Sequence, residues 1–289
     1  MLQHKLINWL LFIFLCLVWG SSFIIMKRSA ETLSGWQIGA IRIFSAGLFF
    51  LPLAVFHLRS VPLKKIPLVI LSGVLGNLFP AFLFAIAIEK KINSSLAGIL
   101  NSLTPLLVIV LGILLFKEKL QRKKMAGVVV GFVGLIILSL SKGAVTVDNF
   151  GFTLLVLLAT LCYALNVNMV SHYLQGVDPM KIATVSLAFM MIPAGVIAWQ
   201  QNVFSIVRYD EAAQMPIAAI VLLGIVGSAI ATAIFYFLIK RAGGLFASLV
   251  TYGIPVISIF WGMMDGENVT AIQMSCLAMI LGGVYLANK

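Results

Sequence analysis

Long apolar blocks alternate with short polar connections along the whole chain. Nine blocks carry no charged residue, and a tenth, residues 35–58, is interrupted only by Arg42 and His57. About 20 apolar residues are enough to cross the hydrocarbon core of a bilayer as a helix. We therefore predict ten transmembrane helices, called spans 1 to 10, at residues 6–26, 35–58, 66–88, 92–116, 125–141, 149–171, 182–207, 212–239, 242–264 and 268–288.

The composition excludes a soluble protein. Hydrophobic residues make up 62% of the 289 residues and charged residues 10%, against about 45–50% and about 25% in soluble domains. The net charge of +11 comes from lysines and arginines between the apolar blocks, so it indicates membrane topology rather than nucleic-acid binding. The three cysteines, Cys16, Cys162 and Cys276, fall inside spans. We expect them to be free core residues, without a disulfide or metal site.

The two halves of the chain share an order of small residues and prolines. Residues 71–76 (LSGVLG) parallel residues 222–227 (LLGIVG). An alanine lies eight residues before Pro105, and another lies eight residues before Pro255. The offset between matched positions stays between 141 and 151 residues. This constancy predicts a duplication, with a first five-helix repeat at 1–145 and a second at 146–289.

The charges of matching loops predict that the second repeat is inverted. An odd number of spans forces inversion when the unit is repeated in tandem. The loop after span 4 carries five basic residues, whereas the loop after span 9 carries Asp265 and Glu267 and no basic residue. With both termini cytoplasmic, 13 of the 20 lysines and arginines lie inside, 6 lie outside and Arg42 lies within a span, as the positive-inside rule favours. Lys27 and Arg28 are the exception, because they lie in the first external loop. The expected fold is an all-α integral membrane protein of ten transmembrane helices in two inverted five-helix repeats.

Inverted repeats are typical of secondary transporters, in which two halves rock about a site near the midplane. Residues 19–23 (WGSSF) resemble the span 1 signature of the EamA-type transporters of the drug/metabolite transporter superfamily. Arg42, the sequence LTPL at 103–106 and Glu118 are similar to that family's span 2 arginine, span 4 proline and terminal glutamate. The resemblance covers essentially the whole chain. It implies efflux or uptake of small metabolites through a cavity lined mainly by spans 1, 3, 4, 6, 8 and 9. The chain departs from this pattern at residues 163–164, which read Tyr-Ala where span 1 has Trp-Gly.

Polar residues inside the spans are the candidate site. Span 8 places a polar or small residue at every fourth position from Gly224 to Lys240, which puts them on one helix face. Asn77 in span 3 aligns with Ser228, as pseudo-symmetric halves would require. Arg42 is the clear charge within a span, and such charges are costly enough to suggest function. The alternative for each position is helix packing, or for Arg42 a snorkelling side chain or a pair with Glu31. The predicted substrate-binding residues are Trp19, Arg42, Asn77, Asn101, Tyr163, Asn166, Ser228, Thr232, Tyr236 and Tyr252.

The absence of several sequence motifs narrows the range of possible functions. The sequence contains no Walker-type glycine loop and no hydrolase or metalloprotease motif, so we expect neither an enzyme nor a cofactor. No aspartate or glutamate lies deep in a span, which disfavours organic cations and proton coupling.

We therefore expect a permease or exporter of a small metabolite, working by alternating access in the cytoplasmic (inner) membrane of a bacterium. An amino acid or related zwitterion or anion is the preferred substrate. The alternatives are efflux of lipophilic drug-like compounds, and a non-transporting membrane assembly protein with a closed, dry interior. The expected partners are the substrate and membrane lipid but no nucleic acid, and the protein is expected to be a monomer or a homodimer.

Overall fold

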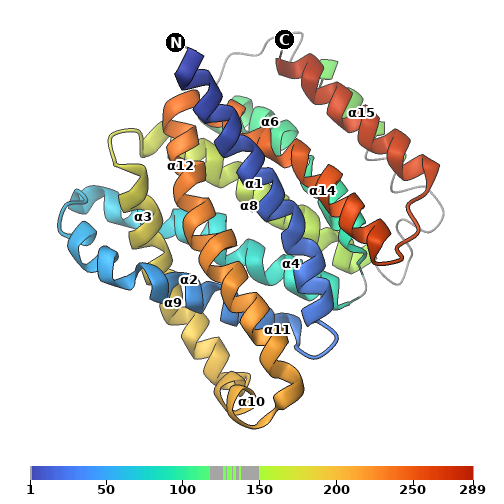
Figure 1. Ribbon diagram of the computed structural model, residues 1–289. Coiled ribbons are helices and arrows are strands. Elements are labelled where there is room, and N and C mark those ends of the chain that lie inside the picture. The colour runs from blue at the N-terminus through green and yellow to red at the C-terminus, as the bar shows by residue number, and fades with distance from the viewer. Residues whose placement is uncertain are drawn as a thin grey trace.

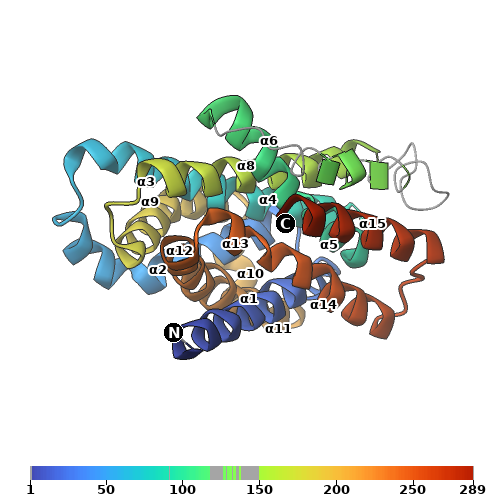
Figure 2. The ribbon, with the colours of Figure 1, turned by 90° about the horizontal axis from the view of Figure 1, so that it is seen from above.

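The computed structural model describes residues 2–90, 92–117, 126–127, 129–131, 133–134, 137 and 150–288. Throughout these residues the regular structure is helical, and the helices lie side by side in one bundle (Figures 1 and 2). Within the described part of the chain, eight helices are long and apolar enough to cross a membrane, and the apolar stretch Ala271–Gly283 in the last helix is shorter. The expected span 5 and the expected repeat boundary at 145/146 fall largely or wholly outside the described residues, as does Glu118.

The first repeat contains a regular part and an interrupted part. Spans 1 and 2 are the continuous helices α1 (Leu2–Ser29) and α2 (Gly35–Leu58). Helix α2 begins with a capping box, because the Ser34 hydroxyl accepts from the Gln37 amide and the Gln37 side chain accepts from the Ser34 amide. Spans 3 and 4 are composite, and their elements are the 3-10 turn η1 (Leu63–Lys65), α3 (Ile66–Gly73), the π-helical segment η2 (Val74–Leu78), α4 (Phe79–Glu89), α5 (Ser94–Asn101) and α6 (Thr104–Phe116).

The second repeat follows the same plan. Spans 6 and 7 are the continuous helices α8 (Phe150–Tyr173) and α9 (Pro179–Gln200), and the short helix α10 (Val203–Tyr209) follows. The remaining elements are α11 (Glu211–Leu222), the π-helical segment η3 (Leu223–Ile230), α12 (Ala231–Ala242), α13 (Gly244–Ser248), α14 (Val250–Met264) and α15 (Ala271–Asn288).

The irregular elements occupy matching places in the two repeats. The π segments η2 and η3 lie in spans 3 and 8, around Asn77 and Ser228. Span 4 is broken at residues 102–103, shortly before Pro105, and span 9 is broken at Leu249, shortly before Pro255. Proline removes a backbone donor and disfavours a straight helix through the preceding turn. Pro105 lies in the first turn of α6 and Pro255 lies inside α14, so each break precedes a proline at a similar place in its repeat.

The second repeat is inverted relative to the first. Lys27 at the end of α1 contacts Asp265 just beyond the end of α14, so these two helices end at the same face of the bundle. Helix α14 continues from α13, whose first residue Gly244 lines one cavity together with His172 and Lys240 at the ends of α8 and α12. Helix α8 therefore ends at the face where α1 begins. Span 6 runs antiparallel to span 1, which confirms the predicted inversion.

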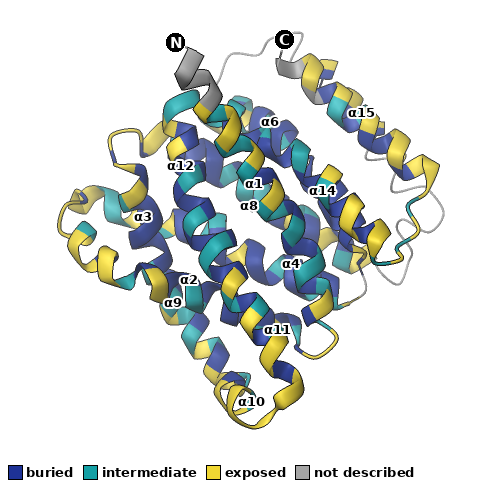
Figure 3. Ribbon diagram, in the orientation of Figure 1, coloured by how far each residue is buried: buried dark blue, intermediate teal, exposed yellow. Residues whose placement is uncertain are grey.

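Spans 2 and 7, which correspond in the two repeats, pack against each other, and the centre of the bundle is buried (Figure 3). Helix α2 lies along α9, and a Cβ atom added at Gly47 would lie 2.5 Å from the Leu187 carbonyl oxygen. Spans 5 and 10 meet in the same way, since a Cβ atom at Gly283 would lie 2.6 Å from the Gly127 oxygen and the Gly131 nitrogen. Spans 5 and 10 therefore approach each other closely through glycines.

Lys27, Arg28, Asp265 and Glu267 form an ion-pair cluster at the face where α1 ends. The Lys27 ammonium lies 2.6 Å from Asp265 and 2.8 Å from Glu267, and Arg28 also pairs with Asp265. Lys27 and Arg28, the exceptions to the positive-inside rule, therefore form ion pairs with the acidic loop of the other repeat. We call this face the cluster end of the bundle, and the opposite face the amino-terminal end.

Candidate functional site

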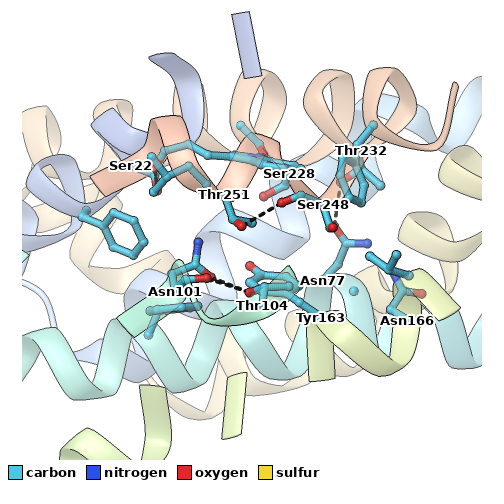
Figure 4. A pocket seen from close by; sticks show the side chains of 18 of the residues that line it. Ser22, Asn77, Asn101, Thr104, Tyr163, Asn166, Ser228, Thr232, Ser248 and Thr251 are labelled. Carbon is cyan, nitrogen blue, oxygen red and sulfur yellow. Dashed lines mark hydrogen bonds between the residues drawn. The ribbon is translucent and has the colours of Figure 1, made fainter. Parts of the chain in front are cut away.

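A central cavity lies in the middle of the bundle, between the two repeats (Figure 4). Its volume is about 60 Å³, counted as the space open to the centres of water molecules. One water needs about 10–15 Å³ by this measure, so the cavity holds a few waters or a small solute. The described lining residues are Trp19, Ser22, Phe23, Met26, Arg42, Gly76, Asn77, Phe84, Asn101, Thr104, Tyr163, Asn166, Val167, Gly227, Ser228, Thr232, Phe235, Tyr236, Ser248, Thr251 and Ile254.

The structure brings nine of the ten expected site residues to this cavity, from spans 1, 2, 3, 4, 6 and 8. Tyr252 is the exception, since it is not among the described residues that line the cavity. The Tyr252 hydroxyl is buried and has no hydrogen-bond partner among the described residues, and the side chain packs against the apolar core. The adjacent Thr251 faces the cavity instead. The span 9 break at Leu249 changes which residues face inward, so a regular helical periodicity does not identify them.

Arg42 carries a positive charge into the wall of the cavity. Its residue exposure is 7%, and its Nε donates to the Ser228 hydroxyl at 2.8 Å across the interface between α2 and η3. Within the part of the chain that the structure describes, no carboxylate lies within ion-pair distance of Arg42, and Glu31 pairs with Arg28 instead. An arginine stays charged even when buried. Because a buried unpaired charge is costly, this guanidinium is positioned to bind an anionic group.

The π segment η3 exposes a backbone carbonyl that Trp19 satisfies. The Trp19 indole nitrogen donates to the Gly227 carbonyl oxygen at 2.8 Å, and its ring packs edge-on against Phe235 with centroids 5.1 Å apart. Such π segments are frequent at functional sites because they redirect side chains within a helix. Trp19 therefore holds η3 in place as well as lining the cavity.

Two asparagines offer unused hydrogen-bonding atoms to the cavity. The Thr232 hydroxyl donates to Asn77 Oδ1 at 2.9 Å, and Asn166 Nδ2 donates to the Tyr236 hydroxyl at 3.2 Å. The other polar atom of each amide, Asn77 Nδ2 and Asn166 Oδ1, is buried with no partner among the described residues. A buried polar group without a partner costs about 1–3 kcal/mol, which a bound solute or an ordered water would offset.

The two helix breaks face each other across the cavity (Figure 4). The Thr104 hydroxyl donates to the Asn101 carbonyl oxygen, and the Thr251 hydroxyl donates to the Ser248 carbonyl oxygen, each at 2.8 Å. These carbonyls lie at the ends of α5 and α13, directly before the starts of α6 and α14. The cavity wall therefore carries the Arg42 charge and, at the breaks, main-chain carbonyl oxygens that can accept hydrogen bonds.

Sequence reasoning missed Phe23, Phe84 and Met26, which join the predicted Tyr163 in an aromatic wall on the side toward the cluster end. Phe23 packs edge-on against Phe84 with centroids 5.3 Å apart, and Phe84 stacks on Tyr163 with centroids 6.1 Å apart. Met26 continues the same face of α1 and lies 3.7 Å from the Arg42 Nη1. Helical spacing from Trp19 and Asn77 would have found these residues, but apolar side chains give no signal above the apolar background of a membrane span.

The ion-pair cluster lies outside the cavity and ties α1, α5 and the loop after α14 together. Glu267 accepts from the backbone amides and hydroxyls of Ser94 and Ser95 at 2.6–3.0 Å, at the start of α5. Burial by itself raises the pKa of the Glu267 carboxyl. The hydrogen bonds from Lys27, Ser95 and Ser94 outweigh burial and lower that pKa to about 2.

Comparison with known proteins agrees with this architecture. A model of the EamA-like transporter family matches the chain twice, at residues 7–140 and 151–289. An uncharacterized transporter of Archaeoglobus fulgidus is 23% identical over 96% of this chain and 98% of its own length. The uncharacterized inner membrane transporter YedA of Escherichia coli is 23% identical over 94% of this chain and 87% of its own length.

Two further similarities concern function and fold. A probable amino-acid metabolite efflux pump of Salmonella typhimurium is 23% identical over 93% of this chain and 90% of its own length. A solved crystal structure with 18% identity has a TM-score of 0.63 and covers 96% of this chain and 95% of that chain. Both repeats thus match the same family, whose members are transporters and not enzymes. The chain belongs to the EamA-like transporter family and is a multi-pass membrane transporter.

Proposed function

We propose that the protein moves a small zwitterionic or anionic metabolite, with amino acids as the preferred class, by alternating access around the central cavity. The observation that carries this proposal is Arg42, a buried guanidinium in the cavity wall without a carboxylate partner among the described residues. A substrate carboxylate would provide the missing countercharge. The substrate ammonium would lie toward the carbonyl oxygens of Asn101 and Ser248, which can accept hydrogen bonds.

The cavity is less suited to the alternative functions. Efflux of lipophilic compounds would favour an adaptable, methionine-rich cavity wall. Met26 is the only methionine among the described residues that line the cavity, so the wall does not have this character. A protein that serves only assembly would have no use for a polar cavity with unpaired amide atoms. The name of the Salmonella typhimurium relative, a probable amino-acid metabolite efflux pump, supports the amino-acid class.

The transport is proposed to run without proton coupling. No aspartate or glutamate is among the described residues that line the cavity, and a proton-coupled carrier generally needs an ionisable group on the path. The protein is further proposed to lie in a bacterial inner membrane with both termini cytoplasmic. The distribution of basic residues supports this orientation, and the relative YedA is an inner membrane transporter.

Counterflow in proteoliposomes tests the substrate class. Purified protein is reconstituted, and exchange of labelled neutral amino acids is compared with exchange of matched amines that lack the carboxylate. Loss of a hydrogen bond to a charged group costs about 1.5–3 kcal/mol, so Arg42→Gln should slow amino-acid exchange about tenfold or more. Arg42→Lys should keep part of the rate, because it keeps the charge but not the planar donor geometry.

Arg59→Gln is the matched control. Arg59 follows the end of α2 and is exposed, so its loss should leave exchange unchanged. Wild-type exchange by a folded Arg42→Gln variant, or equal exchange of the amines and the amino acids, would contradict the proposal.

A further inference from the structure

A second cavity opens beneath the central one at the amino-terminal end of the bundle. Its volume is about 650 Å³ by the same measure. We call it the vestibule, and its described lining residues are Val108, Ile109, Asn168, Val170, Ser171, His172, Leu174, Gln175, Val177, Pro179, Ile182, Tyr236, Ile239, Lys240, Gly243 and Gly244. His172, Gln175 and Lys240 are exposed, so solvent reaches this space.

Tyr236 is the one described residue that lines both the central cavity and the vestibule. Its exposure is 1%, so the ring fills the space between them. Along η3 and α12, Ser228 and Thr232 face the central cavity, Tyr236 follows at the boundary, and Lys240 lies in the vestibule. At Tyr236, the two spaces are therefore separated by one side chain.

Two features hold the Tyr236 side chain in this place. Asn166 Nδ2 donates to its hydroxyl at 3.2 Å from α8. Gly76, within the π segment η2, leaves room for the pair, because a Cβ atom there would overlap the Asn166 amide and lie 3.0 Å from the Tyr236 hydroxyl. The same Asn166 presents its unpartnered Oδ1 in the central cavity. The Asn166 amide thus faces the central cavity with its oxygen and contacts Tyr236 with its nitrogen.

The opposite side of the central cavity is closed differently. Phe23, Phe84 and Tyr163 pack against one another there, and the ion-pair cluster lies beyond them. Three aromatic rings from three spans make a thicker closure than one tyrosine. In this conformation, the shorter route out of the central cavity leads past Tyr236.

We infer that Tyr236 is the gate through which substrate passes between the central cavity and the vestibule, with Asn166 as the residue that positions it closed. Rotation of the Tyr236 ring away from Asn166 joins the two spaces into one path toward the amino-terminal end. This inference rests on the proposed alternating access, but it can be tested without knowing the substrate.

Thiol accessibility in membrane vesicles tests the gate. The native residues Cys16, Cys162 and Cys276 are replaced by alanine, and a reporter is placed in the central cavity by Ser22→Cys. A second reporter, Gln175→Cys, marks the vestibule. Both are treated with a membrane-impermeant thiol reagent from either side of the membrane, and the side that modifies the vestibule reporter defines the vestibule side.

The reporter in the central cavity should react slowly from the vestibule side while Tyr236 is present. Tyr236→Ala should raise its rate about tenfold or more, and Tyr236→Phe should raise it by less, because it removes only a hydrogen bond of about 0.5–1.5 kcal/mol. The neighbouring Phe235 lines the central cavity but is not among the described vestibule residues, so Phe235→Ala should not raise the rate from that side.

Two outcomes would overturn the gate. In the first, the cavity reporter already reacts as fast as the vestibule reporter with Tyr236 intact. In the second, Tyr236→Ala leaves the cavity reporter slow although the vestibule reporter still reacts, and a cooperative thermal unfolding transition in detergent shows that the variant is folded. Because no substrate is involved, a gate that passes this test would stand even if the amino-acid exchange experiment failed.

Discussion

At the scale of single residues, several buried polar side chains of the cavity wall have a hydrogen-bond partner on another span. Arg42 of span 2 bonds Ser228 of span 8, and Thr232 bonds Asn77 of span 3. These pairs use part of the hydrogen-bonding capacity of each side chain and leave the rest facing the cavity. A residue that belongs to such a pair and also faces the cavity should therefore matter more for transport than for insertion of the protein into the membrane.

Asn77→Leu should reduce the initial rate of transport about tenfold, since it removes a neutral hydrogen bond and the free amide donor. Insertion into the membrane should be unchanged, because leucine is readily accepted in a span. The measurement is uptake into proteoliposomes, with protein amount in the membrane fraction as reference. Thr160→Val is the control, because Thr160 is fully buried but bonds only carbonyls of its own helix. Equal transport by both variants would remove Asn77 from the site.

At the scale of elements, the π segments depend on contacts from other helices. Trp19→Phe removes the hydrogen bond to the Gly227 carbonyl oxygen, and this loss should destabilise the protein by about 0.5–1.5 kcal/mol. The measurement is the thermal unfolding midpoint in detergent. Trp199→Phe should have little effect, since Trp199 is 73% exposed. Equal midpoints for the two variants would show that Trp19 does not support η3.

The contact of spans 5 and 10 offers a matched pair of glycines. A side chain at Gly283 would meet the backbone of Gly127 and Gly131, whereas one at Gly282 would meet nothing within 4 Å. Gly283→Ala should therefore lower the unfolding midpoint, at a cost of about 1–3 kcal/mol from overpacking. Gly282→Ala should leave it unchanged or raise it slightly, because alanine favours a helix by up to about 1 kcal/mol. A loss of stability in both variants would argue against close packing at Gly283.

At the scale of the whole molecule, the ion-pair cluster joins the two repeats at one end of the bundle. The pKa of Glu267 falls from its ordinary value of 4.5 to about 2 in the folded protein. A carboxylate with a lowered pKa stabilises the fold above its unfolded value, and this contribution is lost as the pH falls through its folded value. Stability should therefore decline between about pH 4.5 and pH 2.

Glu267→Gln should remove that part of the pH dependence and lower stability at neutral pH, where the charged hydrogen bonds are worth about 1.5–3 kcal/mol in favourable cases. The measurement is a series of unfolding midpoints across this pH range. Glu31→Gln is the control, since Glu31 is exposed and pairs only loosely with Arg28 at 3.9 Å. An unchanged pH dependence in Glu267→Gln would assign the acid sensitivity to another group.

Coupling of transport to a proton gradient is also a property of the whole molecule. With the substrate gradient held fixed, collapse of a proton gradient should leave the rate of transport into proteoliposomes unchanged, because no carboxylate is among the described residues of the cavity. A rate that falls together with the proton gradient would show that a titratable group outside the described residues couples transport to protons.

The sequence alone determined the class of fold, the duplication and many of the residues that line the central cavity. Block lengths follow from bilayer thickness, and the loop charges report inversion, so both can be read without a structure. Nine of the ten expected site residues line the central cavity, because a polar residue in an apolar span has few places to go other than the protein interior.

Only the tertiary structure decided which residues of different spans contact each other. The π segments, the break at Leu249 that turns Thr251 rather than Tyr252 inward, and the aromatic wall at Phe84 leave no local signal. The countercharges of Lys27 and Arg28 come from the other repeat, more than 230 residues along the chain. The position of Tyr236 between two cavities depends on Asn166 and Gly76, which lie on two other spans. Such contacts are set by the packing of distant segments, and a helical period describes only one segment at a time.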